Sequence, residues 1–123
     1  MARVLVVEDE VVVLILAESV IKELGHSTYS AASVTEALKL FNNPGEIEAL
    51  FTDIRLPEGN LGGLELAQKL REQQPSLKVL YTTGEALTDG IKAMFVENAR
   101  FLAKPYTAEE LKAAVSDLLA SED

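Results

Sequence analysis

The chain has 123 residues, of which 48% are hydrophobic and 25% charged, enough for one compact domain with a single core and too few for a second. Its net charge of -9 argues against binding nucleic acid or an anionic membrane surface, since both need clustered Lys and Arg, and favours a cation or a basic partner. No cysteine is present, so disulfides and thiolate metal sites are excluded, and a cytoplasmic location is the expectation. The first apolar run, Val4–Val7, is too short for a signal peptide or a membrane span.

Short apolar runs rich in β-branched and aromatic residues recur along the chain and predict strands. In chain order they are Val4–Val7, Ser27–Ala31, Ala49–Thr52, Val79–Thr82 and Arg100–Ala103, and the second is the weakest. Apolar residues at helical spacing lie between and after these runs. They predict helices around Val11–Leu24, Ala37–Phe41, Leu64–Leu70, Ile91–Phe95 and Leu111–Leu119.

Two of these helices have a recognisable start, and one has a recognisable end. Ser33 with Glu36, and Thr107 with Glu110, have the spacing of a capping box, in which hydroxyl and carboxylate each accept from a free N–H. Gly25 is a C-terminal stop for the first helix. Strands that are apolar on both faces and joined through helices need a parallel sheet covered on each side. The sequence therefore predicts a doubly wound α/β fold with five strands and five helices.

Polar residues follow the predicted strands at selected ends. Glu8, Asp9 and Glu10 follow the first strand, and Asp53 follows the third. The fourth ends at Thr82-Thr83-Gly84, and the fifth at Lys104-Pro105. In a doubly wound sheet the ligand crevice lies beyond the carboxyl ends of the strands, so these groups are expected to converge there. Carboxylates packed together repel unless a hard cation with oxygen ligands lies among them, which makes Mg²⁺ the natural candidate.

In their order and spacing these motifs resemble the receiver domain of two-component response regulators, in its single-domain form. The resemblance covers essentially the whole chain, from Val4 to the helix after Lys104-Pro105. It implies a flavodoxin-like topology, a cytoplasmic phosphoprotein of signal transduction, and one receiver domain over residues 1–123 with no output domain. Whether the chain stands alone or was cut from a larger regulator or hybrid kinase is left open.

The resemblance also implies roles for individual residues. Asp53 is the phosphoacceptor, and Mg²⁺ is held by Asp9, by Asp53, by the main-chain carbonyl of Arg55 and, through a water, by Glu8, which stands where aspartate is usual. Lys104 contacts the phosphoryl group. By the same resemblance, the Lys104-Pro105 peptide bond is cis.

Further roles concern the phosphoryl oxygens, the switch and the lifetime of the phosphorylated state. The backbone N–H groups of Ile54 and Gly84 are expected at the phosphoryl oxygens. Thr83 and Phe101 are the switch pair, and Phe101 lacks the hydroxyl of the family's usual tyrosine. Arg55 and Glu85 are modulating positions that can pair across the pocket mouth, hinder the attacking water and lengthen the phosphorylated lifetime.

The segment between Pro57 and Gly63 is longer than is usual for the family. It includes Gly59 and Gly62 and runs into Gly63, and these three glycines leave much backbone entropy to lose on ordering. The sequence therefore predicts that this segment is mobile.

The partners implied are a histidine kinase or a phosphotransfer protein, an output protein of unknown identity, and a homodimer formed through the last two helices. Such a domain is not an enzyme beyond catalysing its own phosphorylation and dephosphorylation. A degenerate receiver that only binds proteins remains an alternative. A Mg²⁺-dependent phosphohydrolase would want an acid where Arg55 stands. A nucleotide- or flavin-binding module would want a glycine-rich loop where Glu8, Asp9 and Glu10 stand.

Overall fold

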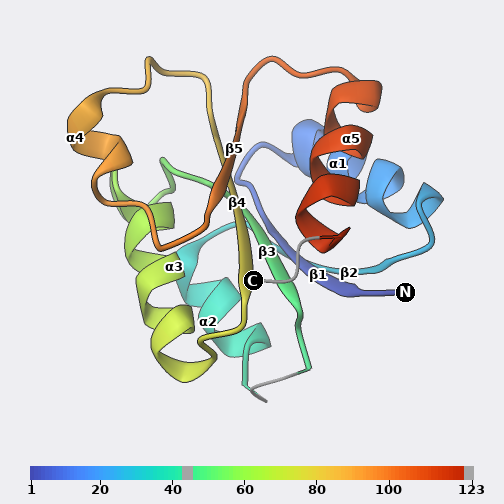
Figure 1. Ribbon diagram of the computed structural model, residues 1–123, viewed down its shortest axis with the longest axis horizontal. Coiled ribbons are helices and arrows are strands. Elements are labelled where there is room, and N and C mark those ends of the chain that lie inside the picture. The colour runs from blue at the N-terminus through green and yellow to red at the C-terminus, as the bar shows by residue number, and fades with distance from the viewer. Residues whose placement is uncertain (43–45, 121–123) are drawn as a thin grey trace.

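The computed structural model describes residues 1–42 and 46–120 (Figure 1). The expected domain end at residue 123 lies outside them. The strands are β1 Arg3–Val7, β2 Ser27–Ala31, β3 Ala49–Asp53, β4 Lys78–Thr83 and β5 Arg100–Ala103. The helices are α1 Val11–Glu23, α2 Val34–Leu40, α3 Gly62–Gln73, α4 Asp89–Lys92 and α5 Ala108–Ala120.

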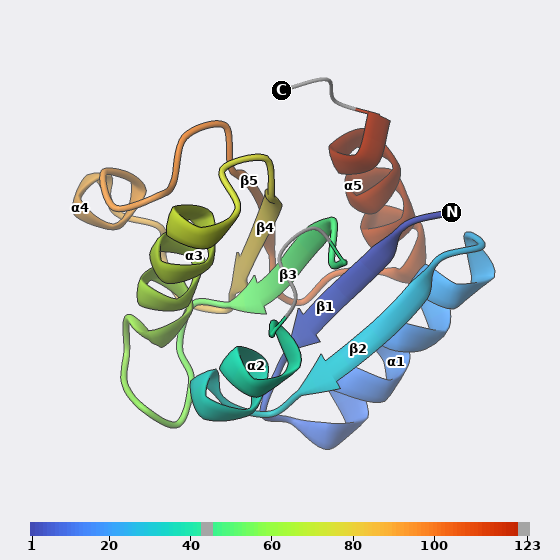
Figure 2. The same ribbon diagram turned by 90° about the horizontal axis from the view of Figure 1, so that it is seen from below.

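The strands form one sheet in the order β2-β1-β3-β4-β5, and every neighbouring pair is parallel. Two views at right angles show α1 and α5 on one face of this sheet and α2, α3 and α4 on the other (Figures 1 and 2). The predicted doubly wound α/β fold is therefore confirmed. Its order reverses between β1 and β3, which places the crevice at their carboxyl ends.

The sheet separates two hydrophobic cores, because successive side chains on a strand point to opposite faces. Leu5 and Val7 of β1 face the core beneath α2 and α3, whereas Val4 and Val6 face the core beneath α1 and α5. All five residues of β3 are buried, as is expected for the central strand of a covered parallel sheet. Asp53, the last residue of this strand, is therefore held in a fixed position.

The two predicted helix starts and the predicted end of the first helix are confirmed. The Ser33 hydroxyl accepts from the Glu36 N–H at 3.1 Å, and the Thr107 hydroxyl accepts from the Glu110 N–H at 3.0 Å. Gly25 follows α1 with a φ of +95°, a conformation that favours glycine, and its N–H donates to the Lys22 carbonyl.

The apolar face expected for α1 is only partly right. Ala17, Val20 and Ile21 are buried, but Val11 and Ile15 are more than half exposed. Leu14, in the same turns, is half buried against the core beneath α1 and α5, so only one side of these turns is covered. An apolar surface on α1 results.

The fourth helix is shorter than expected: α4 ends at Lys92 and does not reach Phe95. Met94 and Phe95 donate to carbonyls three residues back, at Ile91 and Lys92, so the chain tightens into turns instead of continuing an α-helix. The Val96 N–H then donates to the Tyr81 hydroxyl at 3.2 Å. Within the described residues, no helix is long and apolar enough to cross a bilayer.

Candidate functional site

The carboxyl ends of β1, β3, β4 and β5 meet around a cavity of about 530 Å³. It collects the polar strand ends predicted from the sequence. Its lining residues are Asp9, Glu10, Asp53, Arg55, Leu56, Pro57, Thr83, Gly84, Glu85 and Lys104. Glu8 lies beside it, hydrogen-bonded to Lys104.

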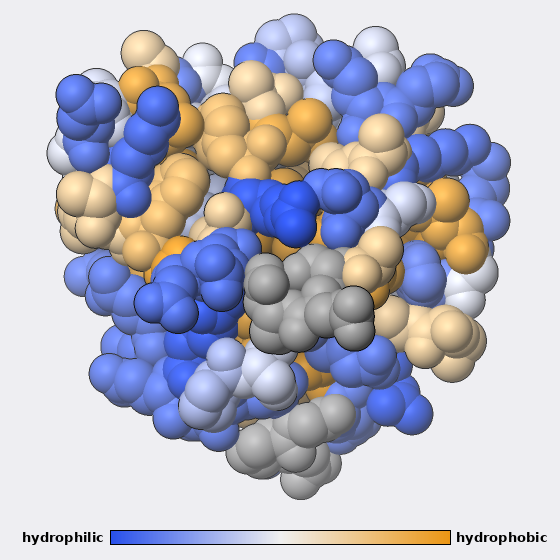
Figure 3. All heavy atoms as spheres, in the orientation of Figure 1, coloured by the Kyte–Doolittle hydropathy of each residue, from blue (hydrophilic) through white to orange (hydrophobic). Residues whose placement is uncertain are grey.

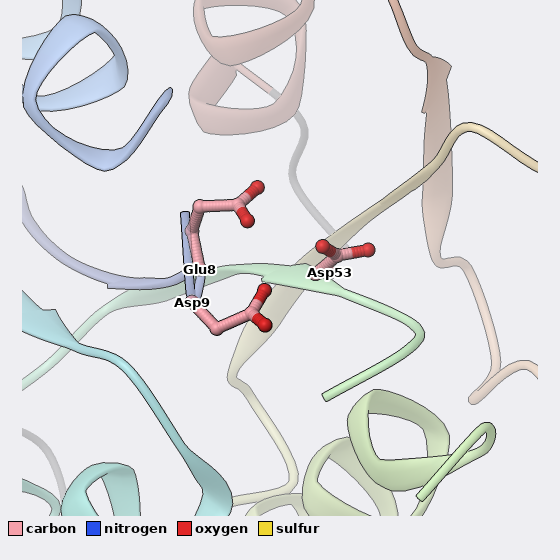
Figure 4. Close-up of side chains that lie close together, drawn as sticks. All are labelled: Glu8, Asp9 and Asp53. Atoms are coloured by element: carbon pink, nitrogen blue, oxygen red, sulfur yellow. The ribbon is translucent and has the colours of Figure 1, made fainter. Parts of the chain in front are cut away.

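Three carboxylates converge at this end of the sheet. Glu8 and Asp9 leave the end of β1 and direct their carboxylates toward Asp53 at the end of β3 (Figure 4). One oxygen from each lies within 4.8 Å of the others. Glu8 and Asp53 are buried and Asp9 is exposed, so the group opens to solvent on one side. The clustering expected from the sequence is therefore present.

Lys104 supplies positive charge within this group. Its ammonium lies 2.5 Å from Glu8 Oε1 and 2.9 Å from Asp53 Oδ2. Burial by itself lowers the pKa of Lys104, but the hydrogen bonds to Glu8 and Asp53 outweigh this effect, and the pKa is raised. Burial raises the pKa of the Glu8 carboxyl, although hydrogen bonds from Lys104 and the Glu10 N–H act in the opposite direction. Lys104 therefore remains an ammonium at neutral pH, close to Asp53.

The end of β4 contributes a hydroxyl. Thr83 is buried, and its Oγ1 accepts from the Glu85 N–H at 3.2 Å. The Glu85 carboxylate in turn accepts from Arg55 Nη1 at 2.7 Å, with both side chains about 60% exposed. The pair suggested by the sequence is therefore formed across the pocket mouth, and it connects the segments that follow β3 and β4.

One of the two backbone donors expected at the pocket is engaged elsewhere. The Ile54 N–H donates to the Thr82 carbonyl at 2.9 Å, because the parallel ladder continues one residue beyond β3. The expectation that it meets a phosphoryl oxygen does not fit this bond. The next N–H, that of Arg55, was not predicted from the sequence, and it has no hydrogen-bond acceptor among residues 1–42 and 46–120. The N–H of Gly84 has none in this part of the chain either. Only the register of the sheet could have revealed this.

Phe101 lies in a row of aromatic rings on the face of the sheet that carries α4; the segment from α4 to Val96 is called the α4 side. Its ring centroid is 6.3 Å from that of Phe95, which is 4.4 Å from that of Tyr81. Tyr81 is fully buried, and its importance was missed because a tyrosine in an apolar strand is most simply core. The hydroxyl that Phe101 lacks is present two residues before Thr83, on Tyr81. The Lys104-Pro105 bond is cis, as the resemblance implies.

The sheet is doubly wound and parallel, and three carboxylates, a lysine and a threonine lie at its carboxyl edge. This combination defines a signalling class of α/β domain, in which an aspartate lies in an acidic crevice. The chain belongs to the family of response regulator receiver domains, whose model matches residues 4–116. It is thus a receiver domain of two-component signalling. Phosphorylation and Mg²⁺ binding are general features of this family.

Relatives of known type agree with this assignment. The chain is 30% identical to the chemotaxis protein CheY homolog of Campylobacter jejuni, over 97% of this chain and 93% of that protein. It is also 30% identical to the sensor kinase CckA of Brucella abortus, over 99% of this chain but 13% of the kinase. It covers 49% of the probable transcriptional regulatory protein SYNPCC7002_A0851 of a Picosynechococcus species, at 32% identity over 96% of this chain. The chain therefore spans less than half of these two longer relatives.

Solved structures share the fold. A response regulator receiver domain protein from Clostridium thermocellum superposes with a TM-score of 0.84 at 30% identity, covering 98% of this chain and 95% of that one. A response regulator receiver protein from Sinorhizobium medicae gives a TM-score of 0.88 at 27% identity, covering 99% and 97%.

The donor set suits Mg²⁺. The side chains of Glu8, Asp9 and Asp53 offer only oxygen, which this hard cation prefers, and they lie close enough together to share one ion. The exposed Asp9 leaves the site open to the waters that Mg²⁺ usually retains.

Proposed function

We propose that this receiver takes a phosphoryl group from a phosphohistidine of a partner protein onto Asp53, and changes conformation as a result. The observation that carries the proposal is the placement of Asp53. Its carboxylate is buried at the end of the central strand, yet it lines the open cavity and lies 2.9 Å from the Lys104 ammonium. An acid in that setting can act as a nucleophile toward an electron-poor phosphorus.

In the transfer, one Asp53 oxygen forms a bond to phosphorus while the phosphorus–nitrogen bond to the donor imidazole breaks. The imidazole keeps that electron pair and takes up a proton from solvent, and the receiver is left with an acyl phosphate. Lys104 is placed to offset the charge on the phosphoryl oxygens. The N–H groups of Arg55 and Gly84, which line the cavity, are the backbone donors left for these oxygens.

Glu8, Asp9, Asp53 and the Arg55 carbonyl would hold Mg²⁺. When bound, the ion compensates the negative charge that accumulates as a phosphoryl group approaches this acidic crevice. Lys104 pairs with both Glu8 and Asp53, so the chain itself offsets part of the negative charge of the crevice.

The switch follows from the bond that Thr83 makes. Its hydroxyl accepts from the Glu85 N–H, and its own O–H can donate to an oxygen of a phosphoryl group on Asp53, which would draw Thr83 toward Asp53. Movement of Thr83 would then release Glu85 and, through its carboxylate, Arg55. Phe101 and the α4 side respond, because both adjoin the strand that carries Thr83.

A surface suited to binding the donor protein lies beside the cavity. Val12, Ile15 and Leu16 of α1 are each more than half exposed. A hollow of about 380 Å³ is lined by Val13, Leu16, Pro105 and Tyr106, and it shares Gly84 and Lys104 with the acidic cavity. Apolar area next to the acceptor suits a protein donor, which must hold its phosphohistidine there while the transfer occurs.

The test is exposure of the protein to Mg²⁺ and acetyl phosphate, followed by measurement of the intact mass. Wild type gains one phosphoryl group, whereas Asp53→Asn gains none, nor does wild type in excess chelator. An unmodified wild type, under conditions that load a control receiver, would favour the degenerate, protein-binding alternative. Rapid turnover of small phosphoesters would instead favour a phosphohydrolase.

Donor docking is tested separately. Leu16→Glu places a charge on the apolar surface but leaves the acceptor site intact. We expect unchanged loading from acetyl phosphate and transfer from a phosphorylated histidine kinase domain slowed by about tenfold or more. Equal rates from the protein donor would overturn the docking proposal alone.

A further inference from the structure

The segment from Arg55 to Leu61 forms one lip of the acidic cavity and carries three of the residues that line it, Arg55, Leu56 and Pro57. The three glycines that follow Pro57 predict mobility, but Gly62 and Gly63 belong to α3, and the hydrogen bonds of the segment oppose that expectation. Leu56 and Gly59 exchange two backbone hydrogen bonds, at 2.9 and 3.1 Å, which close the segment into a turn. Leu56 is 4% exposed, so the turn is also anchored in the core.

Glu58, at the tip of this turn, reaches across to α2. Its Oε1 accepts from the Val34 N–H at 3.0 Å, and its Oε2 accepts from the Thr35 N–H at 3.1 Å. Oε2 also accepts from the Thr35 hydroxyl at 3.2 Å. The carboxylate therefore binds α2 through both oxygens. The Val34 N–H, followed by the N–H and hydroxyl of Thr35, accordingly holds the pKa of Glu58 below its ordinary value.

These N–H groups are the ones that the helix's own cap leaves open. The first N–H groups of a helix have no partner within it. In α2 the Ser33 hydroxyl accepts from Glu36, and the Glu36 carboxylate accepts from Ala32. Val34 and Thr35 remain, and Glu58 accepts from both. The first turn of α2 is thus completed by the lip of the cavity.

Apolar packing joins the same two segments. A Cβ at Gly62 would lie 3.1 Å from the Leu56 Cβ and 3.4 Å from a Val34 methyl group, so the three residues are in close approach. The turn is fixed to α2 by this packing on one side and by the Glu58 carboxylate on the other.

We propose that Glu58 is a positioning residue for the acceptor site: by binding α2 it holds the main chain around Arg55 in place before a cation and a phosphoryl group arrive. This rests on the proposed function, because the Arg55 carbonyl and N–H belong to the site proposed above. A lip ordered in the folded protein loses less conformational entropy on binding, so the cation binds more tightly than it would to a free loop.

Glu58→Ala is the test, and Glu36→Ala is its matched control. Both remove a carboxylate that accepts from backbone N–H at or just before the start of α2, but Glu36 makes no hydrogen bond or ion pair to the lip in the described residues. The two readouts are amide hydrogen exchange of residues 54–61 without metal and the affinity for Mg²⁺ alone by calorimetry. For Glu58→Ala we expect exchange about tenfold faster and Mg²⁺ binding weaker by about threefold to tenfold. Glu36→Ala should leave both unchanged while lowering the melting temperature.

A graded variant adds a second check. Glu58→Gln keeps one acceptor oxygen and no charge, so its exchange and its affinity should fall between those of wild type and Glu58→Ala. Equal Mg²⁺ affinities in Glu58→Ala and Glu36→Ala would overturn the inference and leave the proposed function standing, with Glu58 a helix cap only. A wild type that neither binds Mg²⁺ nor accepts a phosphoryl group would overturn the proposed function, and this inference with it.

Discussion

Two segments leave neighbouring strand ends and line the same cavity, yet they are built differently. The segment after Asp53 is fixed by the Leu56 turn, by Glu58 on α2, and by Gly63, whose N–H donates to the Ile54 carbonyl at 2.8 Å. The segment after Thr83 is exposed from Gly84 to Ala86 and leads into α4, which has no buried residue. In the space-filling view, hydrophobic atoms remain visible on the α4 side (Figure 3).

The difference separates two tasks. A phosphoacceptor has to be held in one geometry, since transfer depends on the placement of reacting atoms. A switch element has to change its packing at low energetic cost, and such elements come from the less stable parts of a fold. Asp53 lies on the fixed side and Thr83 at the start of the exposed side, so the function proposed above would combine a rigid acceptor with a mobile switch element.

The largest expected effect is on the fixed side. A Cβ at Gly63 would overlap the carbonyl oxygen of Asp53 and lie 2.9 Å from the Ile54 Cα, and backbone cannot yield as a side chain can. Gly63→Ala should therefore lower the free energy of unfolding by about 3 kcal/mol or more, measured by urea denaturation. The control is Gly90→Ala in α4, where a Cβ meets only the Thr88 hydroxyl at 3.8 Å, and which should be neutral or stabilising. Similar losses in both variants would contradict the comparison.

On the exposed side, the Tyr81 hydroxyl holds the end of the α4 turn through the Val96 N–H. Tyr81→Phe removes that acceptor and should lower the free energy of unfolding by about 1 kcal/mol. Amide exchange should speed up more at Val96 than at other residues. Tyr29→Phe is the control, because the Tyr29 hydroxyl donates to Glu46 near the surface, away from the α4 side. Unchanged exchange at Val96 would show that Tyr81 does not restrain the α4 side.

A pH effect is expected beside the cavity. Burial raises the pKa of Tyr106 to about 12, whereas an unfolded phenol titrates near 10. The folded state then binds more protons than the unfolded state between these values, so stability falls as pH rises through this window. Between about pH 9 and about pH 11.5, wild type should lose roughly 1 to 2 kcal/mol more than Tyr106→Phe, allowing for partial burial, in urea denaturation. Parallel losses in the two proteins would rule out this role for Tyr106.

The smallest effect concerns the bridge between the two segments. Arg55 and Glu85 are largely exposed, so their pairing contributes little to stability. We propose that it hinders the attacking water, and that the Arg55→Ala, Glu85→Ala double variant therefore loses its phosphoryl group about threefold faster than wild type, a change of ~0.7 kcal/mol in the barrier. Decay of the phosphorylated mass with time measures this. Faster loss in wild type would refute the proposal.

Much of the fold was predictable because its signals are local. Apolar runs, capping boxes and Gly25 each depend on near neighbours in sequence, and all appear where expected. Asp53 and Lys104 were predictable as site residues, because in a parallel sheet the ends of the strands must meet at one edge. The family resemblance then assigned their roles.

Register, close approach and packing between distant segments were decided only by the tertiary structure. The ladder that engages the Ile54 N–H, the contact that requires Gly63 to be glycine, and the reach of Glu58 to α2 all join segments whose distance is set by the whole sheet. The turns that follow α4 likewise end in a hydrogen bond to Tyr81, a core residue on another element. The sequence alone determined which groups reach the acidic edge, because strand direction follows from the local pattern. Which of these groups are free to act depends on hydrogen bonds that form only when the chain is folded.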